Sequence, residues 1–138
     1  MKRLFILLAL LTSSLFTFAQ TNRNKVNLSD KELVNFLWGF AQAHPDGFTI
    51  GIDTFDQPRE GIVVSYAATQ NSFDKKSMPA VIKHAREHEG FVGGWYNPEN
   101  KKYYFDSNRI FPEDSLAAAV KFARENGQHT VYICSKDI

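Results

Sequence analysis

Apolar residues recur every three or four positions in three segments of the chain, which is the spacing of helices that bury one face. These segments cover residues 28–45, 78–90 and 112–126. Glycine stands at the end of the second and third segments, at Gly90 and Gly127, where helices commonly stop. We therefore predict three amphipathic helices at these places.

The first helix has the clearest start signal. Ser29 is followed three positions later by Glu32, which predicts a capping box in which each side chain bonds the other residue's backbone. Pro45 lies just beyond the predicted end of this helix. In the second helix Ser77 is the predicted N-cap, which places Pro79 in the first turn, where its missing N–H is tolerated.

Five shorter runs, rich in β-branched and aromatic residues, predict strands. Polar stretches separate them, and NPEN at 97–100 has the composition of a tight turn. We expect these runs to form two hairpins and one lone strand. The predicted strands cover residues 47–52, 61–68, 91–96, 101–111 and 129–134.

The predicted elements follow one another as a helix, then two strands and a helix twice over, and a last strand. The second and third helices align without gaps at an offset of 38 positions, with four identical residues between Lys83–Glu87 and Lys121–Glu125. This alignment indicates an internal pseudo-repeat, with chance similarity of two amphipathic helices as the alternative. We predict an α+β fold in two layers, an N-terminal helix then ββα-ββα-β, with a mostly antiparallel sheet and helices on one face.

The N-terminal residues have the three-part pattern of a secretory signal peptide. Lys2 and Arg3 precede an uncharged apolar stretch, and small residues stand before a cleavage position. A membrane anchor is the alternative, for which the stretch is short because a spanning helix needs about 20 apolar residues. The predicted division is a signal peptide at 1–19, a flexible leader at 20–27 and a single globular domain at 28–138.

The balance of charges and the single cysteine limit the classes of function that the sequence supports. The chain has 16 Lys and Arg residues, two of them in the predicted signal peptide, against 15 Asp and Glu. Such an even balance gives no electrostatic reason to expect binding to nucleic acid, or to a membrane after signal cleavage. Cys134 has no partner for an internal disulfide, and its apolar surroundings predict a buried small residue rather than a reactive thiol.

The string HAREHEG matches the pattern H-x-x-E-H, a zinc-peptidase signature when it lies on a helix. His84 and His88 are one turn apart with Glu87 beside them, which is a spacing that suits a metal ion. A catalytic zinc site needs a third protein ligand, and the spacing nominates neither His44 nor His129. We favour a structural helix end and keep metal binding by His84 and His88 as the alternative; no cofactor is predicted.

The second predicted hairpin carries the richest candidate surface for binding. Along its returning strand Tyr103 and Phe105 share one face, expected to be core, whereas Tyr104 and Asp106 share the other, with Tyr96 beside them. Tyrosine and tryptophan suit interfaces because they combine an apolar body with a polar tip. Stabilisation of the sheet by cross-strand aromatic pairs is the alternative. The candidate ligand-binding residues here are Trp95, Tyr96, Tyr104 and Asp106.

Two further features accompany this hairpin. Gly93 and Gly94 inside a predicted strand indicate a bulge or a close approach of another group to the backbone. The loop before the second helix carries Gln70 and Asn71, which we include as candidate ligand-binding residues, although turn formation explains the same residue types. Neither a phosphate-binding loop pattern nor a nucleophile-elbow pattern occurs in the sequence.

Three strings, ATQNSF at 68–73, GGWY at 93–96 and YYFDS at 103–107, resemble a small module of the polyvalent proteins of phages and mobile elements. The resemblance covers residues 47–134. It implies an accessory or interaction role and carries over no functional residue. This chain departs from that setting because it is short and has its own predicted export signal.

Together these patterns predict a small exported domain, periplasmic or extracellular, that binds a protein or a small ligand and is not an enzyme. One alternative is an exported zinc-dependent hydrolase that uses the histidine pair. Another is an inhibitor or immunity-type partner of a second protein.

Overall fold

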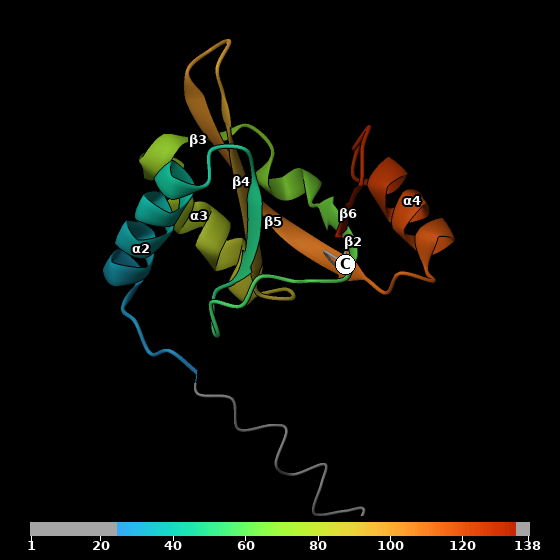
Figure 1. The fold of residues 1–138 in the computed structure, drawn as a ribbon, viewed down its shortest axis with the longest axis horizontal. Helices are drawn as coiled ribbons and strands as arrows, with labels where there is room; N and C mark the ends of the chain where they lie inside the picture. Colours follow the sequence, from blue (N-terminus) through green and yellow to red (C-terminus); the bar gives the residue numbers. More distant parts are fainter. Residues whose placement is uncertain (1–24, 135–138) are drawn as a thin grey trace, which may run out of the picture.

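The structure is a computed structural model that describes residues 25–134 (Figure 1). The predicted signal peptide and residues 20–24 of the predicted leader lie outside the described residues. At the start of the described range, Val26 N donates to Asp53 O at 2.9 Å, beside the end of the first strand. The elements are α2 (Asp30–Ala43), β1 (Phe48–Gly51), β2 (Gly61–Ser65), η1 (Ala67–Thr69), β3 (Ser72–Phe73), α3 (Asp74–Arg86), β4 (Phe91–Asn97), β5 (Lys102–Phe111), α4 (Leu116–Glu125) and β6 (Tyr132–Cys134).

Helix α2 begins as its capping box predicts. Ser29 N donates to Glu32 Oε2 at 2.9 Å, and Glu32 N donates back to Ser29 Oγ at 3.4 Å. Each residue thereby satisfies a backbone N–H that the first helical turn would leave without a partner. The predicted cap of α2 is confirmed.

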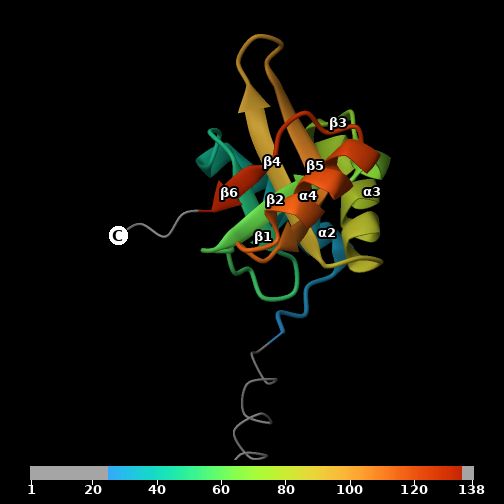
Figure 2. The ribbon, with the colours of Figure 1, turned by 90° about the vertical axis from the view of Figure 1, so that its right-hand side faces the viewer.

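The strands form one curled antiparallel sheet in the order β1-β4-β5-β2-β6, and the short β3 pairs with β5. Helices α2 and α3 lie over β4 and β5, whereas α4 lies over β2 (Figures 1 and 2). Phe105 beneath α3 and Phe111 beneath α4 are an even number of positions apart on β5, so both point to the same face. The predicted α+β fold, with an antiparallel sheet covered by helices on one face, is confirmed.

The hairpin prediction for the first two strands is wrong. β1 pairs with β4 and β2 pairs with β5, so the β4–β5 hairpin lies between the two strands that we expected to be neighbours. The connection between β1 and β2 covers residues 52–60, much longer than the two to five residues, roughly, of a hairpin loop. Among the strands of residues 25–134, only β4 and β5 are joined by a tight turn, and they form the predicted second hairpin, which projects from the body in Figures 1 and 2.

Helix α3 starts one turn earlier than its sequence indicates. It begins at Asp74, so Ser77 is not the N-cap but lies within the first turn, where its Oγ donates to Asp74 O at 2.9 Å. Pro79 therefore lies inside the helix instead of in its first turn. A tertiary contact sets this start: Tyr103 N on β5 donates to Asp74 Oδ1 at 3.1 Å, next to the β3–β5 pairing.

Two apolar clusters fill the space between the sheet and the helices. The larger one lies beneath α2 and α3, where the ring of Trp38 meets Tyr103 edge-on at a centroid distance of 5.0 Å. Tyr103 and Phe105 thus face the core as predicted. The buried residues of the larger cluster are Leu33, Leu37, Ala41, Ile50, Ile52, Met78, Val81, Ile82, Ala85, Val92 and Phe105; those of the smaller are Ile62, Val64, Phe111, Ala119 and Ala123.

Candidate ligand-binding cavity

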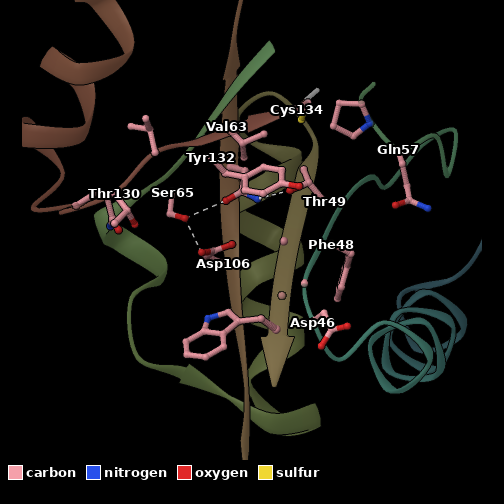
Figure 3. Close-up of a pocket in the computed structure, with 18 residues that line it drawn as sticks. Asp46, Phe48, Thr49, Gln57, Val63, Ser65, Asp106, Thr130, Tyr132 and Cys134 are labelled. Atoms are coloured by element: carbon pink, nitrogen blue, oxygen red, sulfur yellow. Dashed lines mark hydrogen bonds between the residues drawn. The ribbon is translucent and has the colours of Figure 1, made fainter. Parts of the chain in front are cut away.

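The face of the sheet opposite the helices, here called the open face, holds a cavity of about 590 Å³ (Figure 3). Every strand except β3 contributes to its lining, together with the segments before β1 and before β6. Side chains alternate between the two faces of a strand, so the residues that line this cavity are the neighbours in sequence of the core residues. The cavity therefore has a floor built by the sheet itself.

The floor of the cavity is polar. Four side chains, which we call the polar floor, come from three strands: Thr49 from β1, Ser65 from β2, and Asp106 and Asn108 from β5. Pairing places them together, because Thr49 lies opposite Gly93, Gly93 lies opposite Asp106, and Ser65 lies opposite Asn108. Asn108 is only 3% exposed, so its amide is a buried polar group that must be hydrogen-bonded within the protein.

Gly93 makes room for these side chains. A Cβ atom built at Gly93 would lie 2.7 Å from Asp106 Oδ1 and would overlap the Asn108 amide. On the opposite face a Cβ at the next residue, Gly94, would lie 2.8 Å from the ring of Phe105. The close approach to the backbone predicted from the glycine pair is confirmed, and it occurs on both faces of β4.

Hydrogen bonds connect the polar floor. Ser65 Oγ donates to Asp106 Oδ2 at 2.5 Å (Figure 3). With the Asn108 amide nitrogen turned toward Asp106, Nδ2 donates to Asp106 Oδ1 at 2.9 Å, and Asn108 Oδ1 accepts from Gly93 N at 3.2 Å. We assign this orientation because in the opposite one the amide oxygen would face only acceptors and the amide nitrogen would face only donors.

The electrostatic state of Asp106 follows from this position. Burial raises the pKa of the Asp106 carboxyl above its usual range, while the hydrogen bonds from Ser65 and Asn108 act in the opposite direction. Within residues 25–134, no Lys or Arg forms an ion pair with Asp106. A carboxyl group whose pKa is displaced by burial in a cavity is a candidate for function.

Aromatic residues border the cavity. Trp95 on β4 is 44% exposed, and its ring stacks on Tyr104 of β5 at a centroid distance of 4.9 Å and an interplanar angle of 23°. Tyr132, also exposed, lines the cavity from the edge strand β6. The cavity thus combines a polar floor with exposed rings, which is the composition of many ligand pockets.

The structure divides the residues predicted for the hairpin surface. Trp95 and Asp106 both line the cavity, and Tyr104 lies on the same face, behind Trp95. Tyr96, expected beside Tyr104, instead lies opposite Tyr103, on the helix-facing side. The strand register decides this: Trp95 pairs with Tyr104, so the next residue, Tyr96, points to the other face.

The two loop candidates lie elsewhere. Gln70 follows η1 and Asn71 adopts a left-handed φ of 59°, and both are exposed. Neither residue lines the cavity. Asparagine tolerates this backbone conformation better than most residues, so the turn explanation accounts for Asn71.

Sequence reasoning missed Thr49, Ser65 and Asn108. The alternation along β5 was a usable signal for Asn108, because it shares a face with Asp106. Thr49 and Ser65 had no such signal, since strands distant in sequence bring them to Asp106. Their contribution depends on a strand order that the local pattern does not contain.

The histidine pair of α3 packs against other rings. His84 and His88 stack on each other with centroids 3.9 Å apart, and Tyr66 contacts both from the segment after β2. Tyr66 also meets Phe122 of α4 edge-on, so this cluster joins α3 to α4. Burial is the main cause that lowers the pKa of His84, which favours its uncharged ring.

The structure also bears on two features of the sequence, the possible metal ligands and the single cysteine. Among residues 25–134, no three His, Cys, Asp or Glu side chains are grouped so that they could hold a metal ion. Cys134 is buried, as predicted, and lines the cavity at the end of β6. Burial raises the pKa of its thiol, which favours the protonated and less nucleophilic form.

Comparisons with known proteins add no relative: no protein-family model, curated protein or solved structure matches the chain. In the part of the chain that the structure describes, no helix is both long and apolar enough to span a bilayer.

Proposed function

We propose that this protein is an exported, non-enzymatic binding domain whose ligand occupies the open-face cavity. The observation that carries the proposal is the polar floor: at the base of a cavity that is open to solvent, the buried Asn108 amide lies beside the half-buried side chains of Thr49, Ser65 and Asp106. A sheet face that only needed to be solvated would not require Gly93 to make space for a buried carboxyl and amide. The volume of about 590 Å³ also falls within the range of small-molecule sites, about 300–1,000 Å³.

The groups on the floor favour binding over catalysis. Ser65 Oγ donates a hydrogen bond to Asp106, but a carboxylate is ordinarily a weaker base than the histidine that most often activates a serine nucleophile. No histidine lines the cavity within the described range, and Asp106 is the one acidic side chain of the polar floor. Stabilised hydrogen-bonding groups beside exposed rings are well suited to hold a ligand in one orientation.

The predicted signal peptide supports the exported location in this proposal. If residues 1–19 are removed on export, protein recovered from the periplasm or the medium should begin at Gln20. Intact-mass measurement of the recovered protein tests this directly. Recovery of the uncleaved chain in the cytosol or in the membrane would contradict it.

A ligand screen with paired variants tests the cavity assignment. The exported protein is screened by thermal shift against small polar and amphiphilic compounds, and the affinities of hits are then measured by calorimetry. Trp95→Ala should weaken binding, whereas Tyr96→Ala should not, because these neighbours on β4 point to opposite faces of the sheet. The proposal fails if the hits bind both variants equally well or if no compound binds.

A further inference from the structure

We infer that the ligand of the open-face cavity is an organic cation, with an ammonium or guanidinium group that pairs with Asp106. This inference rests on the proposed function, because it names the chemical class of the ligand for the same cavity. It is carried by three observations: the charge of the lining, the hydrogen-bonding capacity that remains on Asp106, and the rings beside it.

The lining carries negative groups and no described positive one. Asp46 and Asp106 both line the cavity, whereas no Lys, Arg or His among residues 25–134 does so. The chain as a whole is close to neutral, with 16 basic and 15 acidic residues, so this local excess is not a general property of its surface. An anionic ligand would meet repulsion here, whereas a cation would relieve the cost of a buried carboxylate.

The Asp106 carboxylate still has acceptor capacity. Ser65 occupies one acceptor position on Oδ2 and Asn108 occupies one on Oδ1, whereas an ionised carboxylate has about four such positions. The two existing bonds also orient the carboxyl group, so that a ligand does not have to order it. An ammonium group offers three donors and a guanidinium offers a planar set, and both form strong charge-assisted bonds to carboxylate.

The rings that border the cavity favour the same ligand class. Trp95 is held in place by its stack on Tyr104, and Tyr132 lines the opposite side of the cavity. Faces of tryptophan and tyrosine attract ammonium and guanidinium groups through the ring quadrupole. A neutral sugar also stacks on such rings, but it does not require a buried carboxylate that has no cationic partner in the described part of the chain.

The pH dependence of binding distinguishes the two ligand classes. A proton and an organic cation compete for the same carboxylate, so affinity for the cation should fall as pH drops below the pKa of Asp106, by about tenfold per pH unit. Asp46, Tyr132 and Cys134 are the other titratable groups that line the cavity among the described residues. The decrease should persist in Asp46→Asn and disappear in Asp106→Asn.

Calorimetry on the exported protein with matched probes tests the inference. The probes are n-butylammonium and n-butylguanidinium, their uncharged counterpart n-butanol, and methyl glucoside as a neutral sugar. Both cations should bind, n-butanol should bind at least about 10-fold more weakly, and Asp106→Asn should weaken cation binding about 10- to 100-fold. Asp46 is exposed, so Asp46→Asn should have a smaller effect.

Ser65→Ala provides a second variant that leaves the carboxyl in place. Removal of the Ser65 hydrogen bond raises the pKa of Asp106 further, so the weakening of cation binding should begin at a higher pH than in the parent protein. Unchanged cation binding in Asp106→Asn overturns the inference. Trp95-dependent binding of methyl glucoside, without cation binding, overturns the ligand class but keeps the cavity as a binding site; binding of no probe and no library compound overturns the proposed function as well.

Discussion

The two faces of β5 carry different chemistry within one strand. On the helix-facing side, Phe105 is 2% exposed and lies in the larger apolar cluster. On the open face, Asp106 and Asn108 form hydrogen bonds across the sheet at the base of a cavity. One face of the sheet therefore contributes stability through burial of apolar side chains, whereas the other holds a carboxyl group whose desolvation costs stability.

The largest expected effect lies on the helix-facing side. Phe105→Ala removes a buried ring from the core and should lower the free energy of unfolding by about 3–5 kcal/mol. Trp95→Ala removes a larger but partly exposed ring from the open face and should cost less, because it loses the stack on Tyr104, about 0.5–1.5 kcal/mol, and the burial of only part of its surface. Urea denaturation of both variants measures the difference. Equal losses would contradict the assignment of stability to one face.

The next effect concerns the close approach at β4. Gly93→Ala places a Cβ against Asp106 and Asn108, so we expect a loss of about 1–3 kcal/mol together with disruption of the polar floor. Gly39→Ala is the matched control, because a Cβ at this α2 position meets nothing within 4 Å and alanine favours the helix by about 0.5–1 kcal/mol. The melting temperature should therefore fall in Gly93→Ala and rise in Gly39→Ala. A Gly93→Ala protein as stable as the parent would show that the side chains of the polar floor can move aside.

Replacement of the buried carboxyl should stabilise the domain in a pH-dependent way. Because the pKa of Asp106 is raised in the folded state, the folded protein holds the proton more tightly than the unfolded chain does. Stability of the parent protein should thus fall as pH rises from the unfolded pKa to the folded pKa, by about 1.4 kcal/mol per pH unit, and level off above it. Urea denaturation at a series of pH values measures this, and Asp106→Asn should not show the decline. If the free energy of unfolding changed with pH in the same way in both proteins, ionisation of Asp106 would not cost stability.

The smallest expected effect concerns a polar group on the core side. Ser107 is fully buried on the helix-facing side, and its Oγ has no hydrogen-bond partner among the described residues. Ser107→Ala removes the cost of that hydroxyl, so the free energy of unfolding should stay level or rise by about 1 kcal/mol. Thr69→Ala is the comparison in thermal melting: it removes the acceptor of the Ser107 N–H and should therefore lower stability. A clear loss of stability in Ser107→Ala would indicate a partner for that hydroxyl.

Local patterns predicted the parts of the fold that depend on neighbours in sequence. The Ser29–Glu32 capping box starts α2, and the tight turn joins β4 to β5. Alternation along β5 separated Phe105 from Asp106, and it therefore identified a core residue and a cavity residue in one stretch. The same reasoning misplaced Tyr96, because the facing of a residue on β4 depends on its register with β5.

Local patterns in the sequence are enough for the three helices, the five longer strands, the hairpin of β4 and β5, and the polar character of one face of β5, because each follows from interactions within a few residues; they did not indicate η1 or β3. The positions of β1 and β2 on either side of this hairpin, and the start of α3 at Asp74, depend instead on contacts between residues far apart in the sequence. Only the tertiary structure decided that Thr49 and Ser65 join Asp106 at the base of a cavity. A strand can pair with several others, and the favoured pairing is the one that buries the most apolar surface while buried polar groups remain hydrogen-bonded. Such pairing involves the whole chain, so local patterns do not specify it.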